Sequence, residues 1–109
     1  MNKNKSKEDL LIEYIKEGDI GNFAELLLKD PNINVNHPDK NYGRTALICA
    51  SFIGNSECVE LLLKHPNINV NHADIEGFTA LMRASSKGHT ECVDVSYADI
   101  YGTCYFDLI

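Results

Sequence analysis

The N-terminal part of the chain carries apolar residues at helical spacing. A first helix is predicted between Ser6, a favourable N-cap, and Gly18, a common helix terminator. A second helix is predicted from about Asn22 to Lys29, because Pro31 forbids its continuation. The apolar positions of these two helices are Leu10, Leu11, Tyr14, Ile15, Phe23, Leu26 and Leu27.

Two later helices share a short apolar face. Leu47 and Ala50, and then Leu81 and Ala84, lie three residues apart, which places each pair on one side of a helix. Alanines at such positions let neighbouring helices approach closely. Thr45 and Thr79 are expected to cap these helices, Gly54 and Gly88 to end them, and a following apolar stripe is formed by Cys58, Val59, Leu62 and Leu63.

Polar and apolar residues alternate between Asn32 and Asn36, which alone would predict a strand. Between helices, the same run is interpreted as an extended segment that leads into a turn, with Ile33 and Val35 buried under the next helix pair. The predicted turns are Asp39 to Gly43 and the shorter Asp74 to Gly77, and both glycines are expected to adopt positive φ.

Several residues recur at a step of 34 positions. The step joins Gly43 to Gly77, Thr45 to Thr79, Gly54 to Gly88 and Cys58 to Cys92. A partial earlier copy ends in LLLKDPNINVNH, and the next copy ends in LLLKHPNINVNH. A fixed period of this size is typical of repeat architectures, in which each unit buries its apolar face against its neighbours.

The repeated segments resemble the ankyrin repeat family, whose period is about 33 residues and whose signature is Thr-Pro-Leu-His-x-Ala. The chain has TALICA at Thr45–Ala50 and TALMRA at Thr79–Ala84, with Ala in place of Pro and Ile or Met in place of His. Gly54–Leu63 resembles the family's second helix, and Asn69–Asn71 its closing segment. The resemblance implies an all-α, ankyrin-type helical solenoid of antiparallel helix pairs joined by β-turn or hairpin-like loops.

The resemblance also divides the chain into about three repeats. Residues 1–5 are expected to be disordered, 6–38 to form a polar N-terminal capping repeat, 39–73 a full repeat and 74–97 a shortened repeat. Residues 98–109 are interpreted as the degenerate start of a further repeat or as a tail, since ADIYG at Ala98–Gly102 follows ADIEG at Ala73–Gly77 after only 25 positions.

Composition narrows the possible functions. A chain of 109 residues is expected to form one domain. The net charge of −6 disfavours a general nucleic-acid or anionic-membrane surface, and Lys3, Lys5 and Lys7 are interpreted as a solvated tail. No secretory signal and no membrane-spanning run is visible. The cysteines, none of them in a Cys-x-x-Cys motif, are expected to be buried reduced thiols, and the expected location is cytoplasmic.

The sequence offers few residues that could form a metal-binding or catalytic site. His89 and Cys92 have the spacing of half a metal site, but no second half exists, so a structural loop histidine is favoured. His37 and His72 are expected to bond to neighbouring backbone. A calcium loop starting at Asp30 is rejected because its sixth and twelfth positions lack Gly and Glu. No catalytic residue, metal or cofactor is predicted, and an enzyme is not expected.

What remains is a surface for recognising another protein, as the resemblance implies. Carried over position by position, the turn tips and the inner-helix concave face comprise Lys40, Asn41, Tyr42, Arg44, Phe52, Ile53, Ile75, Glu76, Phe78, Ser86 and Lys87. Aromatic residues accompanied by Arg are typical anchors of interfaces. The competing interpretation is that Phe52 and Ile53 pack against adjacent repeats.

A second hypothesis concerns the C-terminal end. Residues 96–109 are partly apolar and lack the polar cap that a repeat array needs for solubility. On this hypothesis, the chain is a truncated or assembly-dependent ankyrin fragment whose apolar C-terminal tail mediates self-association.

Overall fold

The computed structural model describes residues 5–94. They contain α1 (Lys7–Glu17), α2 (Ile20–Lys29), α3 (Ala46–Ile53), α4 (Ser56–Leu63) and α5 (Ala80–Lys87), and residues 90–94 begin a further helix. No strand occurs between residues 5 and 94. The run at 32–36, expected to be extended, instead contains turns, in which the Ile33 amide donates to the Asp30 carbonyl and the His37 amide to the Asn34 carbonyl, both at 3.2 Å. The expected all-α class is confirmed.

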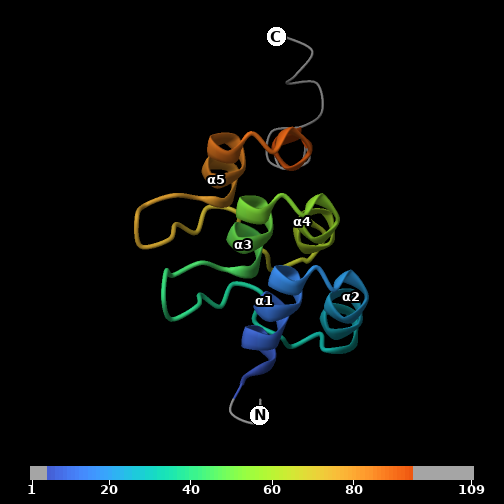
Figure 1. Ribbon diagram of the computed structural model, residues 1–109. Coiled ribbons are helices and arrows are strands. Elements are labelled where there is room, and N and C mark those ends of the chain that lie inside the picture. The colour runs from blue at the N-terminus through green and yellow to red at the C-terminus, as the bar shows by residue number, and fades with distance from the viewer. Residues whose placement is uncertain (1–4, 95–109) are drawn as a thin grey trace.

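The helices form two columns (Figure 1). α1, α3 and α5 stack in one column, α2 and α4 stand beside them, and two long turns project from the inner column. α3 packs against α1, α4 and α5, while α2 packs against α1 and α4. This arrangement of antiparallel helix pairs with projecting turns is the predicted solenoid.

The helix starts follow the predicted caps, with one exception. The hydroxyl oxygens of Ser6, Thr45 and Thr79 each accept a hydrogen bond from the backbone amide three residues later, at 3.1 to 3.3 Å. The predicted start of the second helix at Asn22 was wrong. α2 begins at Ile20, because the Asp19 carboxylate accepts the Asn22 amide at 3.2 Å and so caps the helix two residues earlier.

One glycine both ends a helix and leaves room for a neighbouring repeat. Gly54 follows α3 with φ of 92°, as predicted for a residue that breaks a helix pair. A Cβ atom placed on it would lie 2.7 Å from Nδ1 of His89. The ring of His89 fits there and brings its Nε2 within 3.0 Å of the Phe52 carbonyl oxygen. His89 is therefore a loop histidine that joins two repeats, as predicted.

A single apolar core runs through the stacked helices. Ile33 and Val35 are buried in it, as predicted, although they come from a connecting segment. The remaining members are Leu11, Ile12, Ile15, Phe23, Leu27, Ala46, Leu47, Ile48, Cys49, Ala50, Cys58, Val59, Leu62, Leu63, Ala80, Ala84 and Cys92. Small residues at four of these positions, all alanines, allow α3 and α5 to pack closely.

Hydrogen bonds also connect successive repeats. The side-chain amide of Asn36 donates to the Asn67 carbonyl and accepts from the Asn69 amide, both at 2.8 Å. His72 Nε2 lies 3.3 Å from the Gly43 carbonyl oxygen, as predicted for a histidine that bonds to backbone. The same prediction for His37 was wrong, because its Nε2 instead lies 3.7 Å from an Asp9 carboxylate oxygen on α1.

Within residues 5–94, three thiols are buried and unpaired: Cys49, Cys58 and Cys92. Burial raises the pKa of the Cys49 thiol to about 11, with a further contribution from the Asp39 carboxylate. Burial likewise raises the pKa of the Cys58 thiol to about 11 and moves the pKa of Cys92 in the same direction. A thiol with so high a pKa is a poor nucleophile at neutral pH.

Several expectations concern the ends of the chain. Lys5, placed in the disordered N-terminus by the sequence, forms an ion pair with Glu13 on α1. Residues 1–4, the end of the shortened repeat, Cys104 and the tail 98–109 lie outside the described residues. Between residues 5 and 94, no helix has both the length and the apolar character needed to cross a membrane.

Candidate functional site

The first projecting turn is held together by Asp39. Its backbone amide donates to the Arg44 carbonyl at 2.8 Å, and its carboxylate accepts the amides of Tyr42 at 2.8 Å and Arg44 at 3.3 Å. Gly43 adopts a φ of 66°, as predicted. These bonds close the turn from within, so the side chains at its tip, Lys40, Asn41 and Tyr42, remain exposed.

The second turn repeats this backbone pattern around Asp74. The Asp74 amide donates to the Phe78 carbonyl at 2.9 Å, and one carboxylate oxygen accepts the amides of Glu76 and Phe78 at 3.0 Å. The other oxygen accepts Nε of Arg83 at 2.9 Å, and Arg83 also reaches the Glu76 carboxylate at 2.6 Å. The guanidinium group of α5 therefore ties this turn to the helix behind it.

Asp74 is an acid buried within its turn, with a side chain only 1% exposed. Burial pushes the pKa of its carboxyl upward, but the Phe78 amide, the Arg83 guanidinium and the Glu76 amide outweigh it, so the pKa lies below the ordinary 3.8. The group is thus a carboxylate throughout the neutral range, and its charge serves the turn rather than catalysis.

Cations and aromatic rings alternate between the two turns. The Arg44 guanidinium lies 4.8 Å from the centre of the Tyr42 ring and 4.4 Å from that of Phe52. The Arg83 guanidinium lies 4.1 Å from the Phe78 ring and 5.9 Å from Phe52. At such distances a cation is attracted to the face of an aromatic ring. The contacts therefore link side chains of the two turns and of α3 and α5.

Lys87 completes this arrangement from the end of α5. Its ammonium lies 4.7 Å from the centre of the Phe52 ring, which is half-buried. The competing interpretation for Phe52 is thus partly realised, because its ring contacts cations of the following repeat. Ile53, in contrast, is 45% exposed. The stack consists of Tyr42, Arg44, Phe52, Phe78, Arg83 and Lys87, and we call it the aromatic–cation stack.

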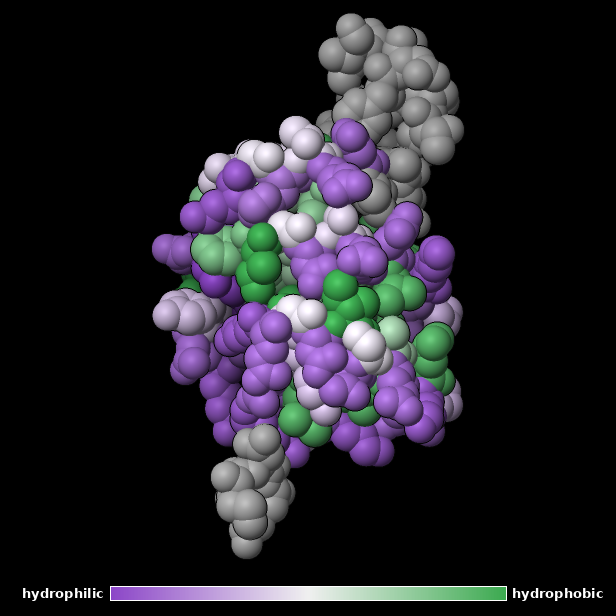
Figure 2. Space-filling view, turned by 45° about the vertical axis from the view of Figure 1, so that its right-hand side comes forward, coloured by the Kyte–Doolittle hydropathy of each residue, from purple (hydrophilic) through white to green (hydrophobic). Residues whose placement is uncertain are grey.

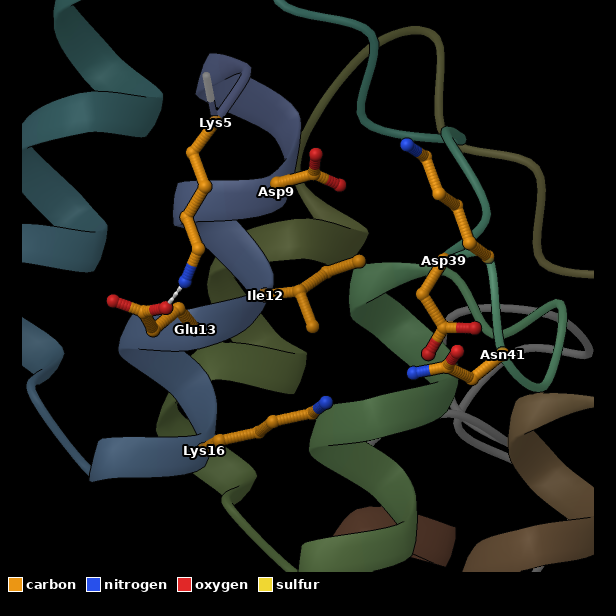
Figure 3. Close-up of a pocket in the computed structure, with 8 residues that line it drawn as sticks. Lys5, Asp9, Ile12, Glu13, Lys16, Asp39 and Asn41 are labelled. Atoms are coloured by element: carbon orange, nitrogen blue, oxygen red, sulfur yellow. Dashed lines mark ion pairs between the residues drawn. The ribbon is translucent and has the colours of Figure 1, made fainter. Parts of the chain in front are cut away.

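Two hollows adjoin the first turn. The larger, of about 410 Å³, lies between α1 and the turn and is lined by Lys5, Asp9, Ile12, Glu13, Lys16, Asp39, Lys40 and Asn41. In Figure 3, the side chain of Lys16 points from α1 toward Asp39 and Asn41. The smaller, of about 210 Å³, is lined by Lys16, Asp39, Tyr42, Arg44, Cys49, Phe52 and Ile53. We call the smaller hollow the Cys49 pocket.

The structure places the predicted site residues on the two turns and on the ends of α3 and α5. It brings Tyr42, Arg44, Phe52, Phe78 and Lys87 into the aromatic–cation stack. The other six, all exposed and outside the stack, are Lys40, Asn41, Ile53, Ile75, Glu76 and Ser86.

Three contributors were missed from sequence: Arg83, Asp74 and Lys16. Arg83 had a usable signal, because it replaces Cys49 at the same position of the repeated motif. A cation that appears at a motif position otherwise occupied by a small apolar residue indicates a new partner nearby, which here is Asp74.

The side chains of the candidate site form ion pairs and cation–π contacts. No group of three metal-ligating side chains occurs in residues 5–94. Figure 2, turned to bring the side of α2 and α4 forward, shows hydrophobic residues in several places among hydrophilic ones.

The fold defines a helical repeat protein in which antiparallel helix pairs are stacked and projecting turns join them. A family model described as Ankyrin repeats (3 copies) matches residues 11–100, which is most of the chain. The chain therefore belongs to the ankyrin repeat family. No individual curated protein matches it. Ankyrin repeats generally act as protein–protein interaction modules and are generally non-catalytic.

Proposed function

We propose that this protein is a non-catalytic module that binds a partner protein through its turn tips and the concave face of its inner helices. The observation that carries the proposal is the aromatic–cation stack, which runs from the first turn to the end of α5. Aromatic and Arg side chains give most binding energy where they are rigid and already ordered. Here the stacking and the Arg83 ion pairs supply that order.

The proposal covers the predicted site residues as a single face. Tyr42 and Phe78 present their rings at the two turns, and Ile75, which is 72% exposed, stands between them. The Ile75 amide donates to the Tyr42 carbonyl at 3.0 Å, so the two turns are joined. A partner that contacts both turns meets a surface with one fixed spacing.

The test is a triple substitution on this face. We expect Tyr42→Ala, Arg44→Ala and Phe78→Ala together to abolish capture of partner proteins from lysate of the native cell, with the helical circular dichroism retained. The matched control carries Leu28→Ala, Glu60→Ala and Lys64→Ala, three exposed positions on or beside the outer helices. Unchanged capture by the face variant, with the partner identified by mass spectrometry, would contradict the proposed face.

We also propose that the protein is cytoplasmic and that residues 6–38, 39–73 and 74–97 are its repeats. The buried unpaired thiols support a reducing compartment. Cell fractionation measures the location, and recovery of the protein from the secreted fraction would contradict it.

The alternative function, self-association through residues 96–109, concerns residues outside those described. It stays a prediction that rests on the apolar residues of that tail. Sedimentation of the chain with and without residues 96–109 decides the question. A monomer in both experiments would rule out self-association.

A further inference from the structure

The Cys49 pocket exists beside the first turn because of one difference between the repeats. Cys49 and Arg83 occupy the same position of the motif, 34 residues apart. In the repeat that begins at Asp74, the Arg83 side chain extends from α5 to the turn and bonds to Asp74 and Glu76. In the repeat that begins at Asp39, the short thiol of Cys49 does not reach Asp39, and a hollow of about 210 Å³ remains.

The walls of the Cys49 pocket are largely apolar. Tyr42, Phe52 and Ile53 line it beside Cys49, and its volume suits one branched or aromatic side chain. Its rim carries the cations Lys16 and Arg44. The pocket is thus suited to an apolar side chain whose neighbours in the partner are anionic.

Arg44 is held more loosely than Arg83. Its side chain is 17% exposed, and its buried Nε lies 3.7 Å from the Asp74 carboxylate, within ion-pair range but beyond hydrogen-bond distance, with no hydrogen-bond partner for Nε among residues 5–94. Arg83, at 2.8 Å from the same carboxylate, is bound there. Asp39, the one acid lining the Cys49 pocket, already accepts the amides of Tyr42 and Arg44.

Around the Cys49 pocket, the acids have partners within the chain, whereas three lysines do not. Its neighbouring acids on this face have partners within the chain: Asp9 near His37, Glu13 with Lys5, and Asp74 and Glu76 with Arg83. The lysines Lys16, Lys40 and Lys87 form no ion pair with an acid between residues 5 and 94. The chain is negative overall, but screening over about 8 Å at physiological ionic strength lets these nearby lysines dominate a bound segment.

We propose that the Cys49 pocket receives an apolar side chain from an acidic, extended segment of the partner protein. Carboxylates on either side of that side chain pair with Lys16 at the rim and with Lys87 beside Phe52. This inference rests on the proposed function and adds the chemistry of the partner to it.

Three short fluorescein-labelled peptides test the inference by fluorescence anisotropy. The first has a central leucine flanked by two aspartates on each side, the second replaces the leucine with serine, and the third replaces the aspartates with lysines. We expect the first peptide to bind about tenfold or more tightly than either of the others. Equal or tighter binding of the lysine peptide, or no binding of the first peptide at about 1 mM, overturns the inference.

Two substitutions address the pocket itself. Cys49→Arg copies the repeat that begins at Asp74, where the same motif position holds an Arg paired with the first acid of its turn, so the variant is expected to fold and to fill the pocket. Ile53→Asp puts a carboxylate on an exposed wall, with Leu28→Asp as the matched control on α2. We expect Cys49→Arg and Ile53→Asp to weaken binding of the first peptide about tenfold. Full binding by folded Ile53→Asp overturns the inference.

The rim is tested by charge reversal. Lys16→Glu with Lys87→Glu is expected to weaken the first peptide and to strengthen the lysine peptide, whereas Lys64→Glu, at the end of α4, should change neither. Equal losses in both variants indicate a general charge effect and overturn the inference.

The two proposals fail separately. If the triple variant loses lysate capture but the peptides show no preference, the proposed binding face is supported. Only the inference that the partner presents an acidic segment is then wrong. If capture survives the triple variant, the face itself is wrong.

Discussion

The turn that begins at Asp39 and the turn that begins at Asp74 close their backbones with the same bonds but differ in what stands behind them. Behind the first is Cys49, and the pocket next to it stays open. Behind the second is Arg83, which joins the turn to α5. The residue at one motif position therefore decides whether a repeat has an open pocket beside its turn, as with Cys49, or a turn tied to the helix, as with Arg83. The fold of the repeat is the same in both cases.

The largest expected effect compares the two inner helices at equivalent leucines. Leu47, 2% exposed on α3, contacts the core from both sides, whereas Leu81 on α5 is half-buried. Leu47→Asp buries a charge and is expected to cost about 4 kcal/mol or more, enough to unfold the chain. Leu81→Asp is expected to cost less. Circular dichroism with urea unfolding measures both, and equal losses would show that α5 is as central to the core as α3.

A smaller effect is expected from the acids that begin the turns. Asp74→Ala leaves two turn amides and Arg83 without their acceptor in a buried place, at a cost of roughly 2–3 kcal/mol. Asp39→Ala removes only amide bonds near the surface, at roughly 1 kcal/mol. Urea unfolding of both variants is the measurement. A larger loss for Asp39→Ala would contradict the stated difference between the turns.

The contact between Arg83 and Asp74 should make the stability of the fold depend on pH in the acid range. Because the folded-state pKa of Asp74 lies below the ordinary 3.8, its contribution to stability is present above that pH and is lost as the pH falls toward the folded-state value. Arg83→Cys, which introduces the residue found at position 49 of the preceding repeat, should raise the folded-state pKa of Asp74 and shrink this pH-dependent loss. Thermal unfolding between neutral pH and pH 3 measures it, with Met82→Ala as a control on α5. An unchanged acid profile in Arg83→Cys would contradict the role of this contact.

The smallest effects on the free energy of unfolding are expected at the tips of the two turns. Lys40→Ala and Ile75→Ala alter exposed side chains and should shift the free energy of unfolding by less than about 0.5 kcal/mol. Urea midpoints check this for each turn. A loss above about 1 kcal/mol at either tip would mean that its exposed side chain supports the turn.

Features set by neighbours in sequence were predictable. The caps at Ser6 and Thr45 depend on bonds three residues apart, and the helix end at Gly54 depends on its own φ. The start of α2 was missed because several polar residues compete for the cap there, and only the folded turn shows that Asp19 takes it. The destination of the His37 ring was missed for the same reason, since Asp9 approaches it from another helix.

The candidate face was predictable as a set of positions but not as a set of contacts. The resemblance to ankyrin repeats, carried over position by position, identified the turn tips and therefore Tyr42 and Phe78. Pairings such as Arg83 with Phe52 join residues 31 positions apart, which meet only after two repeats have stacked. The hydrogen bonds of Asp74 within its turn could not be predicted either, because they depend on distances that the sequence does not contain. The same holds for the position of Lys16 beside the Cys49 pocket.

By itself, the sequence determined an all-α chain of repeated helix pairs, because apolar spacing, caps and glycines act over a few residues. The tertiary structure decided which charges are already paired, which rings are stacked and where a hollow remains. Those outcomes depend on the stacking of one repeat on the next, since electrostatic and packing energies fall steeply over a few ångströms. The exchange of Cys49 for Arg83 is plain in the sequence, but only the stacked repeats turn it into an open pocket beside one turn and an ion pair beneath the other.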